Sequence, residues 1–317
     1  MAYQYLTMLD LAKINKSDQA VGLIEENLNS APEAMVLPAR TIVGTSYKTL
    51  VRTDYARGSF RSPNSGVEPT KSTYVNKQFE TFYYDGQMEM DNAIATGDDQ
   101  GVAHALALEA DGHGRGYLLQ IGKQVWYGIN TINGDALGFP GALQSVDSSL
   151  VVDAGGTTDS VASSVWAVVA DPRFMGLTFG NSTVLQVGEW RKQSVTRSSK
   201  EMTAWKNSLE GWIGIEALSK YAFGRIKKLT TDSGKGLTDT LLSQLIANFP
   251  VGVKPTHLFM TRRSRQQLQA SRTVTLFGQG SGKPSGAQAT IAPVPTEYDG
   301  IPIIATDSIL NTETLAL

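Results

Sequence analysis

The sequence predicts an α+β fold built on one long β-hairpin and one long helix. From residue 41 to residue 55, every odd position is β-branched or tyrosine. A period of two over so long a segment indicates a strand, because successive side chains leave opposite faces. From about residue 98 to residue 127, apolar residues recur at the spacing of a helix face. At ~3.3 Å per residue, the strand would span ~50 Å and reach beyond its own domain.

The hairpin is expected to cover residues 41–90. Its tip, residues 56–73, is polar and contains two glycines and two prolines. It is longer than the roughly two to five residues of a tight hairpin, so we expect it to be mobile unless a partner holds it. The return strand, residues 74–90, carries aromatic side chains on both faces at residues 82–84. This change indicates a half-exposed strand that enters a core through a bulge.

The long helix is expected to begin at Asp98 or Asp99, since either residue can cap a helix and favours its dipole. Gly112, Gly114 and Gly116 interrupt the apolar pattern. Each glycine costs up to ~1 kcal/mol relative to alanine. We therefore expect a kink or a site of close packing at these glycines.

The remaining elements are shorter. The first 40 residues are expected to form an arm with a helical pattern at residues 17–29, followed by Pro32 and Pro38, which favour an extended chain. Ser264 and Gln267 have the spacing of a capping box. The expected strands are 165–170, 184–187, 212–215, 257–260 and 301–305, the expected helices are 237–249 and 264–271, and the expected loops are 131–160 and 278–286.

Composition and charge exclude several classes of protein. The chain has 317 residues, a net charge of −2 and no cysteine. Disulfides and thiolate metal sites are therefore excluded, and the net charge gives no sign of a protein that binds nucleic acid or anionic membranes. The first 19 residues lack the apolar core of a signal peptide, and no run of ~18 apolar residues occurs. We expect a soluble protein made in a cytoplasm.

The sequence offers no convincing catalytic, cofactor or metal site. The glycine-rich segment at residues 278–283 resembles a phosphate loop, but Phe277 and Pro284 replace the required glycine and hydroxyl residue. The three histidines lack the spacing of a helical metal pair. We expect His257 to be a core histidine and His113 to be exposed at the helix kink.

Charges are segregated along the chain. Residues 45–79 contain six basic and two acidic residues, whereas residues 80–111 contain eight acidic and no basic residues. Adjacent blocks of opposite charge suit head-to-tail association of copies. Neutralisation within one chain, or two solvated faces, is the alternative. The predicted intersubunit contacts on the basic hairpin are Lys48, Arg52, Arg57, Arg61, Lys71 and Lys77, and those on the acidic face are Glu80, Asp85, Glu89, Asp91, Asp98 and Asp99.

A second basic group, Arg262, Arg263, Arg265 and Arg272, surrounds the start of one expected helix. It forms either a solvated face or a contact for an acidic or nucleic-acid partner.

Several local sequences occur in a familiar order. They are residues 37–40 (LPAR), 44–53 (GTSYKTLVRT), 123–130 (KQVWYGIN), 138–141 (GFPG) and 254–268 (KPTHLFMTRRSRQQL). In these motifs, and in its order of arm, hairpin, helix and α+β remainder, the chain resembles the tailed-bacteriophage major capsid proteins of the Hong Kong 97-like fold.

The resemblance implies a domain for each part of the chain. Residues 1–40 would be the N-terminal arm, and residues 41–92 the extended hairpin (the E-loop, which lies over a neighbouring subunit) and the start of the peripheral domain. Residues 93–130 would be the spine helix of the peripheral domain. Residues 131–300 would be mainly the axial domain, with strands returning to the peripheral domain, and residues 301–317 a C-terminal strand and tail.

The resemblance also implies a function. The protein would be structural, not an enzyme, and would self-assemble as pentamers and hexamers into the icosahedral virion capsid that encloses phage double-stranded DNA, after assembly in the bacterial host cytoplasm. Its partners would be other copies, a separate scaffolding protein, a portal, decoration proteins and DNA bound without sequence specificity, with no cofactor, metal or membrane.

Three alternatives remain from the sequence. The first is an encapsulin-like compartment of the same fold. The second is an enzyme that uses His113 or the glycine-rich segment at residues 278–283. The third is a nucleic-acid-binding protein that uses the basic hairpin.

Overall fold

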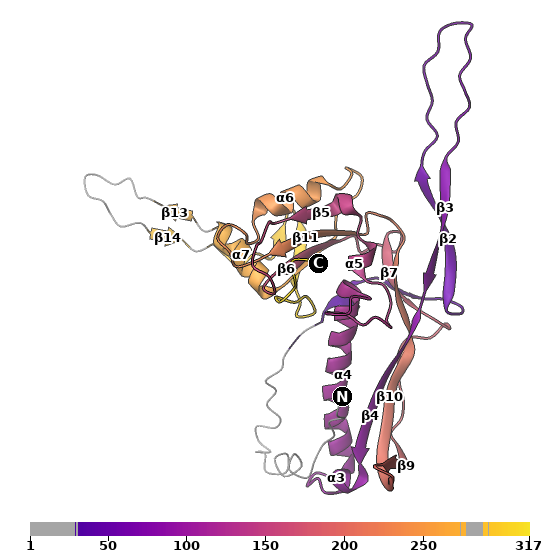
Figure 1. Cartoon of the computed structure of the whole chain (residues 1–317), viewed down its shortest axis with the longest axis vertical. Coiled ribbons are helices and arrows are strands. Elements are labelled where there is room, and N and C mark those ends of the chain that lie inside the picture. The colour runs from indigo at the N-terminus through magenta and orange to yellow at the C-terminus, as the bar shows by residue number, and fades with distance from the viewer. Residues whose placement is uncertain (1–28, 30, 273, 277–287, 291) are drawn as a thin grey trace, which may run out of the picture.

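The molecule has an elongated half, a globular half and a hairpin that projects from the elongated half (Figure 1). The computed structural model describes residue 29 and residues 31–272, 274–276, 288–290 and 292–317. Nearly all of the helical pattern expected at residues 17–29, and the whole loop expected at residues 278–286, lie outside these residues. Among the helices that are described, none has both the length and the apolar character needed to cross a membrane.

The elongated half is organised by β10, a strand of 18 residues. Residues 204–213 of β10 pair with β4 along one edge, and β7, β8 and β9 pair with the other edge. The short strand β1 extends this sheet by pairing with β7 in parallel. The strands are β1 (Ala39–Thr41), β4 (Phe82–Asp91), β7 (Met175–Phe179), β8 (Gln186–Val187), β9 (Arg191–Arg197) and β10 (Lys200–Ala217).

The long helix α4 (Val102–Tyr127) lies along this sheet beside β4, to which α3 (Asn92–Thr96) connects it (Figure 1). The Tyr117 ring packs directly on the backbone of Gly86, where an added Cβ would lie 2.7 Å from the ring. Glycine at position 86 therefore allows the helix to approach the strand closely. A small apolar cluster, which includes Met90, Ile94 and Leu106, packs the N-terminal end of α4 against the sheet.

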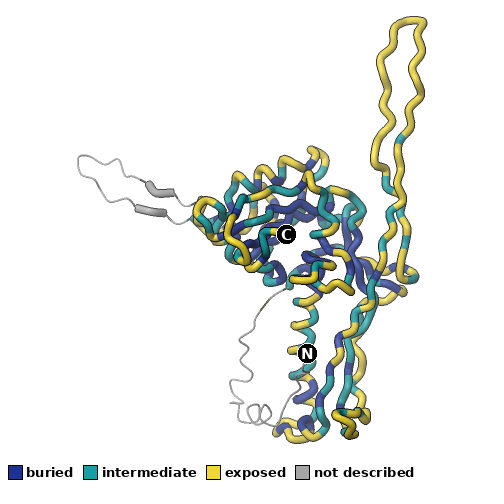
Figure 2. The backbone as a smooth tube through the Cα atoms, in the orientation of Figure 1, coloured by how far each residue is buried: buried dark blue, intermediate teal, exposed yellow. Residues whose placement is uncertain are grey.

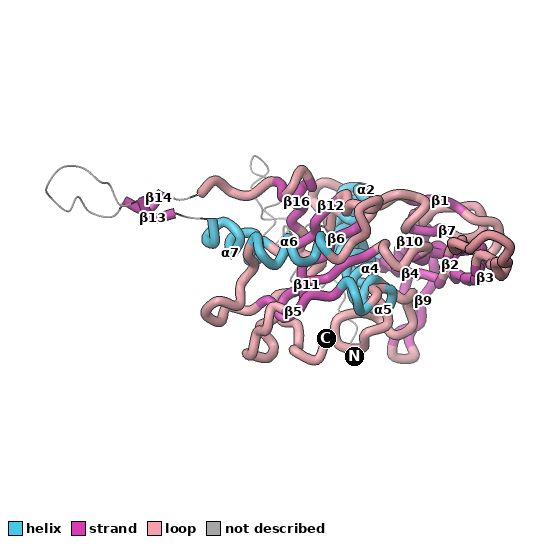
Figure 3. The backbone as a smooth tube through the Cα atoms, turned by 90° about the horizontal axis from the view of Figure 1, so that it is seen from above, coloured by secondary structure: helices cyan, strands magenta, loops and turns pink. Residues whose placement is uncertain are grey.

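The globular half contains a second sheet with the order β15-β16-β12-β6-β11-β5. Figure 3 shows this sheet separated from the strands of the elongated half. The strands are β5 (Val151–Asp153), β6 (Ser163–Val168), β11 (Phe223–Leu229), β12 (His257–Met260), β15 (Glu297–Tyr298) and β16 (Ile301–Ala305). The other elements are α5 (Ala142–Ser145), η1 (Ser148–Leu150), α6 (Asp239–Ala247), α7 (Arg262–Arg272), β13 (Val274–Leu276) and β14 (Gln288–Thr290).

One aromatic cluster joins the two halves. Trp126, in the last turn of α4, stacks on Trp166 of β6 at 5.7 Å between ring centroids and packs against Phe259 of β12 at 5.0 Å. All three side chains are fully buried. Burial of a large side chain contributes about 1.5–3 kcal/mol, so this cluster fixes the end of α4 on the second sheet.

The hairpin is shorter than predicted. Its paired part is β2 (Ser46–Asp54) with β3 (Thr73–Glu80). The predicted first strand is broken at Gly44, whose φ of +80° places the backbone in a region that favours glycine. The predicted return strand is two strands, because the chain leaves β3 at Thr81 and then pairs with β10 as β4. The predicted change of environment after β3 is therefore confirmed.

The long helix differs from the prediction at its start and in its middle. It begins at Val102, with Gly101 at the N-cap position, while Asp98 accepts a hydrogen bond from the Gln100 amide in the preceding turn. The helix continues without a break through its three central glycines, and a Cβ added to any of them would meet nothing within 4 Å. The predicted kink and close packing are both wrong, since tertiary contacts at the two ends hold the helix.

The expected extended arm is structured before residue 40. Glu33–Val36 forms the short helix α2, and Leu37 is buried in the core. The Pro38 carbonyl accepts a hydrogen bond from the Leu177 amide at 2.7 Å, just before β1. Pro38 lacks a donor but keeps its acceptor, so it fits at the entry to an edge strand.

The carboxylate of Glu33 anchors α2. It is 1% exposed and accepts hydrogen bonds from Trp126 Nε1 at 2.8 Å, from the Thr306 hydroxyl and from Ser308 Oγ at 3.2 Å. Trp126 belongs to α4, and Thr306 and Ser308 lie in the segment that follows β16. All three are neutral, so burial raises the pKa of Glu33, and the hydrogen bonds oppose that rise only in part.

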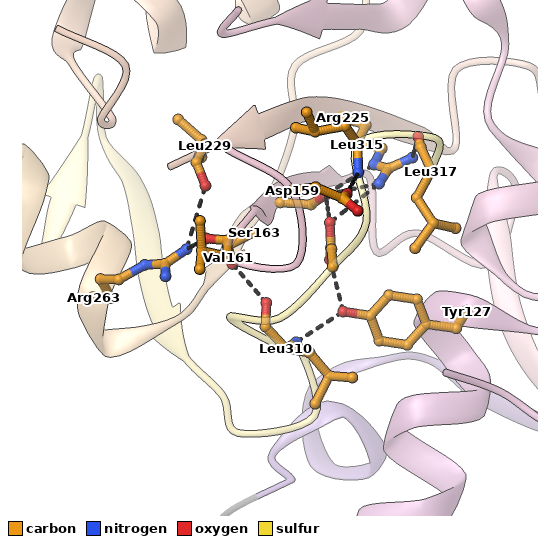
Figure 4. Close-up of polar contacts among 12 residues, drawn as sticks. Tyr127, Asp159, Val161, Ser163, Arg225, Leu229, Arg263, Leu310, Leu315 and Leu317 are labelled. Carbon is orange, nitrogen blue, oxygen red and sulfur yellow. Dashed lines mark hydrogen bonds and ion pairs between the residues drawn. The ribbon is translucent and has the colours of Figure 1, made fainter. Parts of the chain in front are cut away.

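The C-terminal segment is held by a second buried carboxylate, Glu313, whose partners Tyr127 and Arg225 are labelled in Figure 4. It accepts hydrogen bonds from Tyr127 Oη at 2.7 Å and from Ser164 Oγ at 2.6 Å. Arg225 Nη2 lies 3.3 Å from the same carboxylate. The Leu310 amide donates to Tyr127 Oη at 2.8 Å. The segment therefore ties α4 to β6 and β11.

We expect Glu313→Ala to reduce the free energy of unfolding by about 3–5 kcal/mol, because Arg225 is left buried without its anionic partner. Urea denaturation measures the loss. Glu201→Ala, at an exposed position of β10, is the matched control and should change stability by less than about 0.5 kcal/mol. Equal losses in the two variants would contradict a structural role for Glu313.

Glu33→Gln should remove a pH dependence of stability. A carboxyl group whose pKa is raised by folding stabilises the folded state below its unfolded pKa and loses that contribution as the pH rises through the folded pKa. The stability of the natural chain, relative to Glu33→Gln, should therefore fall from about pH 4.5 upward. Urea denaturation between pH 4 and pH 8 tests this, with exposed Glu68→Gln as the control. A difference between natural chain and variant that is constant with pH would refute it.

Candidate intersubunit surfaces

The hairpin has two faces that meet different surroundings. In the observed register, one face is made by odd-numbered residues and the other by even-numbered residues. The odd face carries Tyr47, Thr49, Val51, Val75, Lys77 and Phe79, most of them half-buried. The even face carries Lys48, Leu50, Arg52, Tyr74, Asn76 and Gln78, all of them exposed. The even face is therefore open to solvent along the whole paired part of the hairpin.

The root of the hairpin is fixed by two basic side chains. Lys77 Nζ donates to the carbonyls of Ala217 at 3.3 Å and Leu218 at 3.1 Å, at the end of β10. Burial lowers the pKa of Lys77. Arg40 lies 4.4 Å from the ring centroid of Tyr47 and 2.6 Å from buried Glu216. Lys77 was predicted to be an intersubunit contact, but its amine bonds within the chain.

The tip of the hairpin is exposed throughout. Every residue from 55 to 71 is exposed (Figure 2). Phe60 is fully exposed, and Tyr55 is 71% exposed. Arg57 pairs loosely with Asp54 at 3.4 Å, and Arg61 Nη1 donates to the Ser65 carbonyl at 2.7 Å. These contacts shape the tip without covering its apolar side chains.

The other predicted basic contacts lie on the same projection. Lys48 and Lys71 are exposed, and the Arg52 guanidinium lies over the rings of Tyr55 and Tyr74 at 5.5 and 5.3 Å. Stacking of this kind holds the cation close to the strand while its charge remains in water.

Three of the predicted acidic contacts serve their own subunit. Glu89 pairs with Arg197 and, at 3.3 Å, with Lys206. Asp91 caps α3, and Asp98 is buried, with His104 Nδ1 at 2.9 Å. Glu80, Asp85 and Asp99 are the exposed members of the set.

Asp85 belongs to a second pair that only the sheet register reveals. It lies directly opposite Glu210 on the face of β4 and β10 that points away from α4. Tyr83 Oη donates to Glu210 at 2.7 Å, Ser208 also donates to Glu210, and Gln87 donates to Asp85. The hydrogen bonds from Ser208 and Tyr83 lower the pKa of Glu210 and favour its ionised form. Among the described residues, neither carboxylate has a basic partner within ion-pair distance.

A hollow of about 350 Å³, here called the outer pocket, lies beside this pair. The rings of Tyr83 and Trp212 meet edge to face at 5.3 Å and form its floor. Val184 and Val187 lie at its side and are 55% and 65% exposed. The outer pocket thus combines exposed apolar side chains with the carboxylate of Glu210, and Asp85 lies opposite Glu210 on the neighbouring strand.

A larger hollow of about 530 Å³, here called the inner pocket, lies between β4 and α4. Tyr84, Tyr117, Leu137 and Phe139 contribute to its lining. Its polar groups are used within the chain: for example, Tyr117 Oη donates to the Gln87 carbonyl at 2.8 Å. Its lining also includes Asp85, the carboxylate that lies opposite Glu210.

The histidines take structural positions. His113 lies in the unbroken helix, with Glu109 Oε1 3.0 Å and Tyr117 Oη 3.1 Å from its ring nitrogens. The prediction of an exposed kink residue is wrong. His257 is half-buried beside Thr256 Oγ1 at 2.9 Å, and burial lowers its pKa. Within the described ranges, no three histidine, aspartate or glutamate side chains form a group that could hold a metal.

The arginine cluster at α7 serves the fold. Arg263 donates to the carbonyls of Val161 at 2.8 Å and Asn311 at 3.2 Å, and Arg272 pairs with Asp239 at 2.6 Å. The prediction of a solvated face is therefore wrong for Arg263 and Arg272. The predicted capping box is also wrong, because the Ser264 amide donates to Thr261 Oγ1 at 3.2 Å.

Comparisons with known proteins identify a family and find similar solved structures. The family model of the major capsid protein GP7 matches residues 18–316. The structure of bacteriophage epsilon15 matches with a TM-score of 0.69 and 18% identity, over 99% of this chain and 98% of that chain. The capsid of Myoviridae phage XM1 has a TM-score of 0.46 and 11% identity, over 71% and 99%. A comparison with curated proteins finds no match.

Lys77→Met should loosen the hairpin root, because it keeps the aliphatic stem but loses both bonds to β10. A hydrogen bond of this kind at a half-exposed site contributes about 1 kcal/mol, so amide hydrogen exchange in β2 and β3 should accelerate roughly fivefold. Lys71→Met, at the exposed tip, is the matched control. Unchanged exchange in Lys77→Met would show that the root is held by other contacts.

Proposed function

Because the chain belongs to the family of the major capsid protein GP7, it is a structural protein of a phage capsid, and we propose that its copies assemble as pentamers and hexamers into an icosahedral shell around double-stranded DNA. Its fold is Hong Kong 97-like, as in the epsilon15 structure. The family favours a phage shell over an encapsulin-like compartment. We propose that the chain has no catalytic role in that shell.

The domain division follows the same fold. We assign the hairpin of β2 and β3 to the E-loop, α4 to the spine helix and the sheet of β10 to the peripheral domain. The second sheet, with α6 and α7, would be the axial domain. The pairing of β10 with β4, and of β7 with β10, supports the expectation that strands within residues 131–300 return to the peripheral domain.

The projecting hairpin carries this proposal. Residues 55–71 are exposed, lie away from the rest of the subunit and include a fully exposed phenylalanine (Figures 1 and 2). Burial of an aromatic side chain against another copy would contribute about 1.5–3 kcal/mol. Exposed ion pairs contribute about 0–1 kcal/mol each. Apolar tip residues would therefore supply most of the affinity, and the basic residues would set orientation and register.

Five of the predicted basic contacts remain available for this role. They are Lys48, Arg52, Arg57, Arg61 and Lys71. On the acidic side, we propose Glu80, Asp85 and Asp99 as contacts, while Glu89, Asp91 and Asp98 act mainly within the subunit.

The other partners follow from the family resemblance. We propose a separate scaffolding protein, a portal, decoration proteins and DNA bound without sequence specificity. Assembly would take place in the bacterial host cytoplasm.

The test is assembly of the purified chain, with and without its scaffolding protein, followed by sedimentation and negative-stain microscopy. The natural chain should form rings or closed shells. Replacement of residues 55–72 by Asn-Gly should leave a folded subunit that does not close shells, because Asp54 and Thr73 already pair and can be joined by a type I′ turn.

Circular dichroism and thermal unfolding serve as the folding control for the tip replacement. Normal shells from that variant would contradict the role of the tip. A natural chain that stays monomeric under every condition, including with the scaffolding protein, would contradict the capsid function itself.

A further inference from the structure

We propose that the outer pocket of one copy receives the hairpin tip of a second copy, with Phe60 against Tyr83, Trp212 and Val187, and with Arg57 and Arg61 beside Asp85 and Glu210. This inference rests on the proposed function, because it assumes that copies associate through the hairpin. It adds the place where the tip binds.

The first argument is a contrast on one sheet face. Glu89 and Lys206 lie opposite each other in the register of β4 and β10 and form an ion pair at 3.3 Å. Four residues along β4, the same face places Asp85 opposite Glu210. Like charges directly opposite on paired strands are destabilising. A cation from another copy would relieve this repulsion, whereas the described part of the subunit supplies none.

The second argument is the apolar side of the outer pocket. Tyr83, Val184 and Val187 are each more than half exposed, and they lie next to the carboxylate of Glu210. Interfaces concentrate their affinity where an apolar anchor and a charged group bind together in one pocket. The outer pocket therefore suits a partner segment that carries an aromatic ring and a cation close together.

The third argument is the chemistry of the tip. Phe60 is fully exposed and lies between Arg57 and Arg61 in the sequence, and Arg57 is only loosely paired. The tip is too far from the outer pocket of its own subunit to bind there. Nine residues of β2 at ~3.3 Å each carry the tip ~30 Å away from the root. Figure 1 shows the hairpin projecting away from β4 and β10, the strands that supply Tyr83, Glu210 and Trp212 to the outer pocket. The occupant is therefore a second copy.

The inner pocket is the less suitable receptor, although it is larger. Asp135, one of its lining residues, accepts a hydrogen bond from the Leu137 amide at 2.9 Å. Asp85, its other acidic lining residue, accepts a hydrogen bond from Gln87. Glu210 does not line the inner pocket, although Asp85 does.

The chain has no cysteine, so paired cysteines can report the contact directly. We would prepare Phe60→Cys/Val187→Cys, with Phe60→Cys/Leu137→Cys as the matched control that probes the inner pocket. Each would be assembled into shells, oxidised and separated by denaturing electrophoresis without reductant. We expect the 60/187 pair to convert most of the chain into a ladder of linked subunits. The 60/137 pair and each single variant should remain monomeric.

Charge reversal provides an independent readout if the cysteine variants do not assemble. Glu210→Arg should reduce the yield of shells about tenfold, and Arg61→Glu in the same chain should restore it at least partly. Glu201→Arg, an exposed position elsewhere on β10, should leave the yield unchanged.

The outcomes separate this inference from the capsid function. Shells without a 60/187 ladder, shells with a 60/137 ladder, or no rescue by Arg61→Glu would overturn the outer pocket as the receptor and leave the capsid function intact. A natural chain that forms no shells would overturn both.

Discussion

The pairing of one long strand, β10, with β4 on one edge and with β7 on the other is the constraint on which this structure depends. Because β4 takes its hydrogen bonds from β10, the chain must leave the hairpin at Thr81. The two strands of the hairpin are then left with each other as partners, apart from the contacts at the root. A two-stranded hairpin is at best marginally stable in water. The fold therefore produces a projection that gains most from contact with another copy.

The rest of the subunit supplies a firm base for that projection. Trp126 packs on Trp166, and Glu313 links the end of α4 to β6 and β11, so the elongated and globular halves share one core. The hairpin is held by Lys77 and Arg40 at the surface, where contacts contribute less. Motion should therefore concentrate at the hairpin root. In the proposed pentamers and hexamers, where neighbours would meet at different angles, the root would be the flexible point of the subunit.

Charge has two different uses in this chain. Near the far end of the sheet, Glu89 is neutralised by Arg197 and Lys206, and Asp98 is buried against His104. On the outer face nearer the hairpin, Asp85 and Glu210 remain without a cation in the described residues. Sequence counting placed Asp85, Glu89 and Asp98 in one block and left Glu210 outside it, because it could not assign strand partners. The register divides the block into residues that stabilise the subunit and residues that remain open to a neighbour.

The sequence by itself determined the α+β class, the family and the elements with strong local patterns. The long helix, α6, β12 and β16 lie close to their expected positions. Apolar periodicity acts locally, and so does Pro250, which follows the expected helix at residues 237–249. The tertiary structure decided where the first hairpin strand breaks, that α2 and β1 join the body, and that the helix continues through three glycines. These features depend on partners distant in sequence: β10 for β4, Thr306 for Glu33, and the packed ends of α4. The opposition of Asp85 and Glu210 arises in the same way, because 125 positions separate them in the chain and only the pairing of two strands places them side by side.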